Sequence, residues 1–294
     1  MTEADLAGAV LDGRYRLTRQ IASGGMGAIY EGEHLAIGKD VAVKVLCPDR
    51  ARDAPSLRRF RREAAITRSL SSPHIVHIFD VGRDPELGFY MVMERLEGEN
   101  LASRLERKGR LLRVDACEIA HQAASGLERA HAAKILHRDL KPSNLFLVNT
   151  ADKACLVKVL DFGVAKMFGG ASLPDESLSA VTRSGFTVGT PQYMSPEQAV
   201  GFDSLDERAD VYALGAVLFE TLVGVPSVPD CGSCSETLKE LLRSPAPRLC
   251  AYLRDVDPRL DSLVAEMLCI ERTDRPRTMR EVRVRLGEIL GLSD

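Results

Sequence analysis

Short runs of β-branched and aromatic residues, separated by glycine-containing turns, occupy the first third of the chain. Runs of this length and composition predict β-strands. We expect a strand meander within residues 14–47 and two further strands before residue 94. The predicted strands cover residues 15–17, 28–30, 41–46, 75–81 and 89–93.

A helical period replaces the strand pattern over residues 54–70. Its apolar residues fall on one face, and five arginines, Arg59 among them, fan over the other. Glu63 lies on the apolar face, between Phe60 and Leu70. A carboxylate in such a setting needs a partner, so we expect Glu63 to pair with a basic group from another element.

The pattern becomes mostly helical after Gly98. The strongest helical segments cover residues 114–133, 210–223 and 279–290, and loops are expected at residues 137–145, 161–195 and 224–236. A β-rich first part followed by an α-rich second part predicts an α+β fold.

The composition is that of an ordinary globular protein. The 294 residues include 39 Lys+Arg and 42 Asp+Glu, a formal net charge of −3, and 45% are hydrophobic. A chain of this length can bury a core without disulfides or a structural metal. The near-neutral charge argues against nucleic acid and anionic membranes as partners.

No segment has the pattern of a secretory signal or a membrane span. Residues 1–5 are acidic at the position where a signal would be basic. The longest apolar stretch, residues 211–219, is far shorter than the roughly 20 residues of a membrane helix. The seven cysteines are scattered and odd in number, as is usual for reduced thiols. We therefore expect a cytoplasmic protein.

Three segments carry candidate chemistry, and the first is glycine-rich. Gly24, Gly25 and Gly27 lie between two predicted strands. Glycines there let backbone N–H groups approach phosphate oxygens without colliding side chains, although such a hairpin can also be a plain turn.

The second segment is residues 41–44, where Lys44 ends an otherwise apolar run. Its ammonium must reach an anion, and Glu63 needs a cation. A pair between them would hold Lys44 against nucleotide phosphates. The alternative is a solvated lysine at a sheet edge and an acid at a helix bend.

The third segment is the decisive one. His137-Arg-Asp-Leu-Lys-Pro-Ser-Asn144 is followed by Asp161-Phe-Gly163. A loop that offers Asp139, Lys141 and Asn144, with a second carboxylate at Asp161, suits divalent cations bound to a polyphosphate and can orient a hydroxyl.

With these motifs in this order, the sequence resembles the eukaryotic-like (Hanks-type) serine/threonine protein kinases over about residues 14–290. The motifs Gly24-Gly-Met-Gly27 and Tyr193-Met-Ser-Pro-Glu-Gln198 resemble those of the bacterial branch. The resemblance implies a bilobal kinase fold with an N-lobe helix. Its parts would be an N-terminal extension at residues 1–13, an N-lobe at residues 14–95 and a C-lobe at residues 96–290.

The resemblance also assigns roles in nucleotide binding. Lys44, paired with Glu63, would contact the ATP phosphates. Met93 would be the gatekeeper, Glu94 and Leu96 would lie in the hinge, and Asn100 would be a weaker candidate for the ribose. The loop over the phosphates would comprise Ile21, Ala22, Ser23, Gly24, Gly25, Met26 and Gly27. The adenine would lie among Ile21, Ile29, Ala42 and Phe146.

The resemblance also implies that the loop at residues 137–144 is the catalytic loop and acts on the substrate. Asp139 would orient the substrate hydroxyl and Lys141 would neutralise the transferring phosphoryl group. Asn144 and Asp161 would hold Mg²⁺, for which Mn²⁺ can substitute. Lys141 and Thr190 match the serine/threonine branch, so the expected partners are ATP and proteins with serine or threonine acceptors.

Regulation is expected to act through Arg138. A phosphate on the following loop would neutralise this arginine and order the loop, with Arg59 and Lys166 completing the pocket. The candidate sites are Thr182, Ser184 and Thr187, phosphorylated in trans by a self-associating copy. The alternative is that the loop is only a solvated polar linker.

Three matching residues are interpreted as structural. Asp210 opens a helix that is apolar on all sides, so it should anchor the catalytic loop backbone. Glu197 and Arg275 would form a buried ion pair.

The sequence also departs from the family pattern. Ala22 replaces the first glycine of the loop, and Arg95 occupies the hinge, where its charge is expected to point to solvent. Cys231 and Cys234 form a lone Cys-x-x-Cys without further metal ligands, and the histidines have no metal-ligand spacing. Two rival functions are a nucleotide-sensing pseudokinase scaffold and a small-molecule phosphotransferase.

Overall fold

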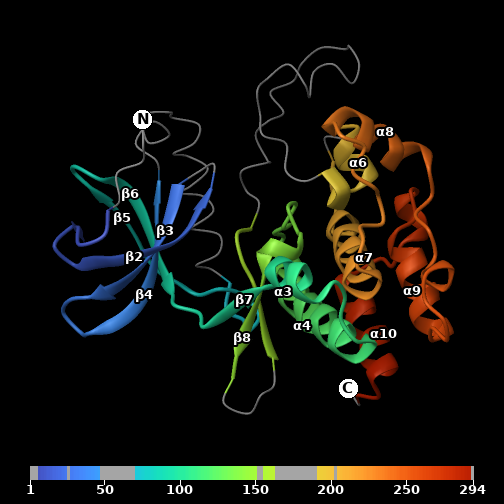
Figure 1. The fold of residues 1–294 in the computed structure, drawn as a ribbon, viewed down its shortest axis with the longest axis horizontal. Coiled ribbons are helices and arrows are strands. Elements are labelled where there is room, and N and C mark those ends of the chain that lie inside the picture. The colour runs from blue at the N-terminus through green and yellow to red at the C-terminus, as the bar shows by residue number, and fades with distance from the viewer. Residues whose placement is uncertain are drawn as a thin grey trace. The chain divides into compact units, whose positions relative to one another are not determined.

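The computed structural model describes residues 6–24, 27–46, 70–150, 155–162, 191–201 and 204–292. The chain divides into two compact units. One comprises Met1–Ser71 and Ile75–Glu97, and the other comprises Ser72–His74 and Gly98–Asp294. The first is a β-sheet unit and the second is mainly helical (Figure 1), as the sequence pattern predicted.

The N-terminal unit is built on an antiparallel sheet in the order β1-β2-β3-β4-β6-β5. Its strands are β1 (Val10–Leu11), β2 (Tyr15–Gly24), β3 (Gly27–His34), β4 (Lys39–Leu46), β5 (Ile78–Asp84) and β6 (Gly88–Glu94). The helix expected at residues 54–70 lies almost entirely outside the described residues.

Alternation of side chains along β4 separates the two faces of this sheet. Val41, Val43 and Val45 pack into a core with Tyr30 and Tyr90. Since neighbouring residues of a strand point to opposite faces, Ala42 and Lys44 lie on the other face. The valines therefore fix the direction in which Lys44 points.

Two strand predictions need correction. β2 continues to Gly24 instead of ending near Leu17, because its pairing with β3 resumes after each of two register irregularities and runs on to Gly24. The fifth strand begins at Ile78, not at Ile75. Ile75 and Val76 are buried, but the ladder with β6 starts only at Ile78 and Met93.

The C-terminal unit holds a small sheet, β7-β8-β9, and seven α-helices within the described residues. The strands are β7 (Gly98–Asn100), β8 (Leu145–Asn149) and β9 (Cys155–Val159). The helices are α3 (Leu101–Lys108), α4 (Arg113–Ala132), α6 (Pro196–Ala199), α7 (Arg208–Val223), α8 (Cys234–Arg243), α9 (Pro258–Met267) and α10 (Met279–Leu290). Short 3₁₀ turns occupy Pro142–Asn144, Pro191–Tyr193, Leu249–Ala251 and Arg272–Asp274.

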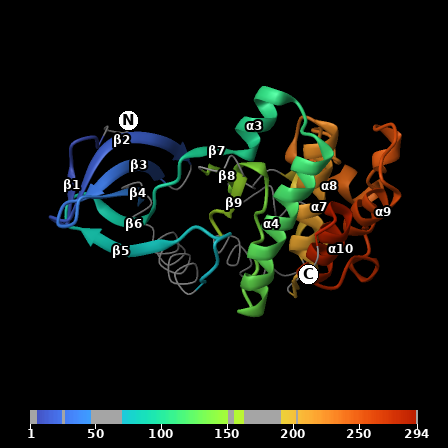
Figure 2. The same cartoon turned by 90° about the horizontal axis from the view of Figure 1, so that it is seen from below.

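Helix α7 is the centre of this unit. It is buried from Ala209 to Phe219, as an all-apolar helix must be, and it packs against α4, α9 and α10 (Figure 2). Gly224 ends it in a left-handed conformation, with φ of 92°. The helices predicted at residues 114–133, 210–223 and 279–290 are confirmed as α4, α7 and α10.

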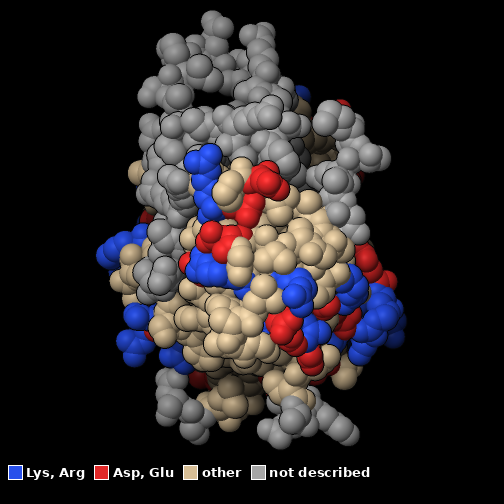
Figure 3. Space-filling model, turned by 90° about the vertical axis from the view of Figure 1, so that its left-hand side faces the viewer, with Lys and Arg blue, Asp and Glu red and all other residues tan. Residues whose placement is uncertain are grey.

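Acidic and basic side chains are intermingled on the face of the molecule shown in Figure 3. The N-terminal unit contains ion pairs such as Arg14 with Asp80 and Arg19 with Glu31. Among the helices that the structure describes, none combines the length and apolar character needed to cross a membrane.

Candidate active site

Asp210, in the first turn of α7, holds the backbone of the loop at residues 137–144. Its Oδ2 accepts a hydrogen bond from the His137 N–H at 2.8 Å, and its Oδ1 accepts one from the Arg138 N–H at 2.8 Å. Asp210 is fully buried. Burial alone would raise its pKa, but the hydrogen bond and charge of His131 and the backbone N–H of Arg138 hold the pKa below the usual value.

His137 links this loop to the segment after β9. Its Nε2 lies 2.9 Å from the Leu160 carbonyl oxygen, and its Nδ1 accepts from the Asp139 N–H at 3.2 Å. The ring packs against Phe162 with centroids 4.9 Å apart. Complete burial lowers the pKa of His137, so the neutral ring donates from Nε2 and serves a structural purpose.

The next residues of the loop bring a carboxylate and an ammonium together. The Lys141 Nζ lies 3.2 Å from Asp139 Oδ2, and about a quarter of each side chain is exposed. The Asn144 amide donates to the Asp139 carbonyl at 2.7 Å, and the Asn144 N–H donates to the Lys141 carbonyl at 2.9 Å. The loop is therefore closed by its own hydrogen bonds, with the functional groups of Asp139 and Lys141 at its surface.

The β8–β9 hairpin brings Asn144 near Asp161. In its antiparallel register Leu145 is paired with Val159, so the residue before β8 faces the residues after β9. A hydrogen bond of 2.9 Å from the Leu160 N–H to the Asn144 carbonyl joins the two ends. Asp161 has a φ of 40°, a conformation that costs non-glycine residues energy.

The donor chemistry at this point fits Mg²⁺. Because the Asn144 NH₂ group is used by the Asp139 carbonyl, the amide oxygen is the atom left to act as a ligand. One amide oxygen and one carboxylate are the hard donors that Mg²⁺ takes together with substrate phosphates and waters. Within the described residues, no cluster of three or more His, Cys, Asp or Glu forms a closed metal site.

In the N-terminal unit, several residues predicted to bind nucleotide share one face of the sheet. The register places Ile29 opposite Lys44, Ala22 opposite Ile29, and Ala42 opposite Met93. Directly paired residues lie on the same face, and so do Ala42 and Lys44, which are two residues apart on β4, so these side chains share one face of the sheet. Ile21 and Ser23 are exposed, and Lys44 is 9% exposed.

Gly27 shows why part of the glycine pattern is required. A Cβ at this position would lie 2.0 Å from the Val45 carbonyl oxygen, and φ is +155°. No side chain fits there. Gly24 is paired with Gly27 where the β2–β3 hairpin turns.

The hinge segment is tied to the sheet. Glu94 Oε1 accepts from the His77 N–H at 2.8 Å, and Leu96 is partly buried. Arg95 forms ion pairs with Glu31, Asp40 and Glu97 at 3.1–3.3 Å and is 31% exposed. Its charge lies at the surface, as expected, and it is paired there with carboxylates on β3, on β4 and in the following link.

Asn100 and Phe146 lie opposite each other in the β7–β8 ladder. The Asn100 side chain accepts from the Ser103 N–H at 2.9 Å and caps α3. Its side-chain oxygen therefore has a structural use, which weakens it as a ribose ligand. Phe146 is partly buried.

Glu197 and Arg275 form the buried ion pair that the sequence suggested. Two N–H···O contacts of 2.8 and 2.9 Å join the groups. The guanidinium also donates to three backbone carbonyls, those of Arg208, Cys269 and Ile270. Every N–H group of the Arg275 guanidinium therefore donates a hydrogen bond.

Seven predicted site residues lie outside the described residues: Gly25, Met26, Glu63, Thr182, Ser184, Thr187 and Thr190. The same holds for Arg59 and Lys166. Their predicted roles stay predictions.

Sequence reasoning missed His131, since the histidine spacing was examined only for metal ligands. Its Nε2 lies 2.7 Å from Asp210 Oδ2 and its Nδ1 lies 3.3 Å from Glu207 Oε2. Burial lowers its pKa, but these two carboxylates outweigh the burial and the pKa is raised. The signal available in the sequence was a histidine at the end of the helix that leads into a loop needing an anchor.

A second missed pair is Tyr193 and Glu220. The Tyr193 hydroxyl donates to Glu220 Oε2, and burial raises the pKa of both groups. Gln198 was also missed: its side chain donates to the Arg138 carbonyl at 2.9 Å. These contacts tie residues 191–198 to α7 and to the catalytic loop.

The cysteine pair carries no visible site. Cys231 and Cys234 are free thiols, and Cys234 begins α8. The Cys231 thiol is near the Pro229 carbonyl oxygen, at 3.6 Å.

Comparison with known proteins gives a consistent result. Residues 15–284 match the sequence profile of the protein kinase domain. A probable serine/threonine-protein kinase of Corynebacterium efficiens is 36% identical over 280 residues, which cover 93% of this chain and 41% of that protein. The serine/threonine-protein kinase PknA of Mycobacterium tuberculosis is 39% identical over 244 residues, 82% of this chain and 54% of that protein.

The fold has close counterparts among solved structures. The crystal structure of the M. tuberculosis PknI kinase domain has a TM-score of 0.71 and 27% identity, and the match covers 96% of this chain and 98% of that one. The expected fold class and family are confirmed by these matches. The chain spans about half the length, or less, of the curated relatives named above.

Proposed function

The chain belongs to the protein kinase domain family, and on that premise we propose that it transfers the γ-phosphoryl group of ATP to serine and threonine hydroxyls of proteins. Relatives named serine/threonine-protein kinases support the acceptor class. The observation that carries the proposal is the loop at residues 137–144. Its buried backbone is fixed by Asp210, while Asp139 and Lys141 remain accessible.

In this proposal Asp139 accepts a hydrogen bond from the substrate hydroxyl and orients its oxygen for attack. The Lys141 ammonium, 3.2 Å from the carboxylate, stabilises charge on the phosphoryl group being transferred. Phosphoryl transfer needs positioning and charge stabilisation more than covalent help. A loop whose backbone is held by buried hydrogen bonds supplies both with little reorganisation.

We assign the metal to Asn144 and Asp161, with Mg²⁺ as the ion and Mn²⁺ as a substitute. When bound, the ion would neutralise phosphate charge. In the N-terminal unit we assign the phosphate contact to Lys44, and the nucleotide base to the face that carries Ala22, Ile29, Ala42 and Met93.

Regulation belongs to the same proposal. Arg138 would pair with a phosphate on Thr182, Ser184 or Thr187, placed there by a second copy of the chain. We place the reaction in the cytoplasm, where ATP is available and thiols such as Cys231 and Cys234 stay reduced.

The test is incubation of wild-type, Asp139→Asn and Asp161→Asn protein with MgATP, followed by intact mass measurement and site mapping. ATP binding is measured separately. Phosphate on serine or threonine in the wild type only, with ATP binding kept in Asp139→Asn, supports the proposal. Nucleotide binding without incorporation into the chain or added protein acceptors favours the scaffold. Transfer to an aminoglycoside instead of protein favours the small-molecule phosphotransferase.

A further inference from the structure

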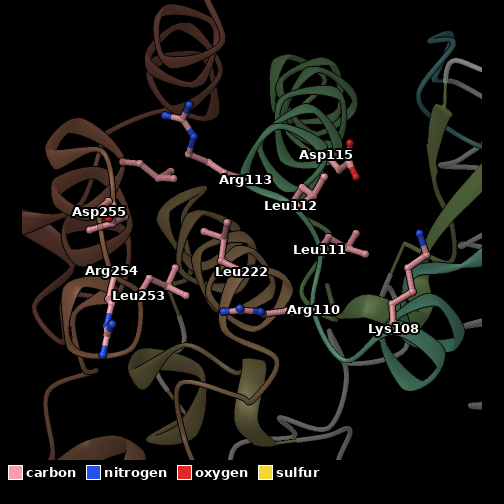
Figure 4. A pocket seen from close by; sticks show the side chains of 12 residues that line it. Lys108, Arg110, Leu111, Leu112, Arg113, Asp115, Leu222, Leu253, Arg254 and Asp255 are labelled. Atoms are coloured by element: carbon pink, nitrogen blue, oxygen red, sulfur yellow. The ribbon is translucent and has the colours of Figure 1, made fainter.

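A cavity of about 610 Å³ opens in the C-terminal unit between two segments far apart in sequence (Figure 4). One wall is the link from α3 to α4, residues 108–113, and the other is the turn before α9, residues 253–256. Leu222, at the end of α7, lies between them. None of the lining residues belongs to the catalytic loop or to residues 191–201. We call this cavity the basic groove.

Backbone hydrogen bonds hold both walls in place. The Leu111 N–H donates to the Thr221 carbonyl of α7 at 2.9 Å, and the Leu253 N–H donates to the Leu249 carbonyl at 2.9 Å. The walls are joined by an ion pair of 3.4 Å between Arg113 and Asp257. The groove is therefore formed before any partner binds, which lowers the ordering cost of binding.

The floor of the groove is apolar, and so is part of its rim. Leu111, Leu222 and Leu260 are buried, while Leu112 on the rim is 74% exposed. Val114 and Tyr252, next to the two walls in sequence, are 49% and 52% exposed. An exposed apolar patch rimmed by charged side chains is typical of an interaction site.

The charged groups around this floor are mostly basic. Lys108, Arg110 and Arg254 are exposed, and none of them has an ion-pair partner among the residues that the structure describes. Arg113, by contrast, is already paired with Asp257, whose pKa the side-chain hydrogen bonds of Arg259 lower to about 2.

Two carboxylates, Asp115 and Asp255, also line the groove. In Figure 4 the Asp115 carboxylate is turned away from Leu222, whereas the Arg110 side chain extends past Leu222 toward Leu253. Arg110, which extends past the apolar floor, has no ion-pair partner among the residues that the structure describes, and an acidic group beside an apolar group would complement it.

We propose that the basic groove docks an acidic peptide segment of a partner protein, with a leucine-like side chain on the Leu111–Leu222 floor and carboxylates against Arg110 and its basic neighbours. A peptide can place its acidic residues one by one and so avoid Asp115 and Asp255. An anionic bilayer would press its phosphates against both carboxylates. The proposal concerns binding alone and does not rest on phosphoryl transfer.

The test uses the full chain and an array of 12-residue peptides, each with two leucines and zero to four Asp or Glu residues. The best binder is then measured in solution by fluorescence anisotropy without nucleotide. We expect the peptides with acidic residues to be selected over those without them. Arg110→Glu should weaken binding by about tenfold or more, and Leu112→Asp should also weaken it.

The matched control is Arg280→Glu, which makes the same charge change at an exposed arginine of α10 outside the groove. It should bind like the wild type, and all three variants should melt like the wild type because each site is exposed.

Four results would each overturn the proposal. The first is that no peptide is selected, and the second is that Arg110→Glu and Arg280→Glu lose binding equally. The third is that no peptide is selected but the chain binds phosphatidylglycerol vesicles, and Arg110→Glu abolishes that binding. The fourth is that the chain self-associates and Leu112→Asp abolishes the self-association. The third result would assign the groove to a membrane surface, and the fourth to a second copy.

Discussion

Asp210 and Arg138 are 72 residues apart in sequence, yet the Asp210 carboxylate accepts the Arg138 backbone N–H at 2.8 Å in the interior of the C-terminal unit. The other carboxylate oxygen accepts the His137 N–H and faces His131. One buried side chain thus sets the backbone conformation that presents Asp139. The positive φ of Arg138, 64°, is maintained by this contact.

Replacing this anchor should destabilise the fold. Asp210→Ala leaves two buried N–H groups and His131 without their acceptor, so we expect a loss of about 3–5 kcal/mol in the free energy of unfolding. Urea denaturation measures it. The exposed Asp230→Ala is the control, and equal stability of the two variants would contradict the anchoring role.

The Glu197–Arg275 pair should behave as one unit. Arg275→Met should cost about 3–5 kcal/mol, since it leaves a buried carboxylate and three carbonyls unpartnered. In a double-mutant cycle, Glu197→Met combined with Arg275→Met should cost less than the sum of the single changes. Additive costs would mean that the two groups do not stabilise each other.

Lys44→Met tests the assigned phosphate contact. The side chain is 9% exposed, so methionine can occupy its place while the ammonium is lost. Phosphoryl transfer should fall by roughly 10²–10³ with little change in melting temperature. Lys39→Met, at the exposed start of the same strand, is the control. Unchanged turnover in Lys44→Met would remove Lys44 from the site.

Gly27→Ala should destabilise the N-terminal unit, because its Cβ would lie 2.0 Å from the Val45 carbonyl oxygen. We expect a cost of about 1–3 kcal/mol and weaker nucleotide binding. Gly13→Ala is a suitable control, since it also has a positive φ, +64°, but meets no atom within 4 Å. Similar thermal melts for both variants would show that β3 can move away from β4.

The His131 ion pairs should make stability depend on pH. The folded-state pKa of His131 is raised above the ordinary 6.5 by Asp210 and Glu207, against the effect of burial. The contribution of protonated His131 to the free energy of unfolding is therefore complete below pH 6.5 and is lost as the pH rises through the folded-state pKa. Urea denaturation of wild type and His131→Gln across this range should show a decline in the wild type that the variant lacks. Parallel curves would assign the decline to other groups.

The sequence predicted the large features correctly where a pattern repeats along one segment. The β-rich run of residues 41–46 predicted the strand that carries Lys44, and the long apolar run that follows Asp210 predicted α7. The shorter helices α3, α8 and α9 were not predicted, because eight to ten residues give few repeats of a helical period. The start of β5 was misplaced because burial of Ile75 and Val76 looks the same in a sequence as pairing in a ladder.

The sequence alone determined the family of this protein, through the residue types at Asp139, Lys141, Asn144 and Asp161 and their order along the chain. Only the tertiary structure decided which side chains form hydrogen bonds or ion pairs with each other. The contacts of His131 with Asp210, of Tyr193 with Glu220 and of Arg95 with Glu31 join separate elements, as do the two walls of the basic groove. Such pairings depend on the distances between side chains of different elements. Packing sets these distances, and a local pattern of residues does not contain them.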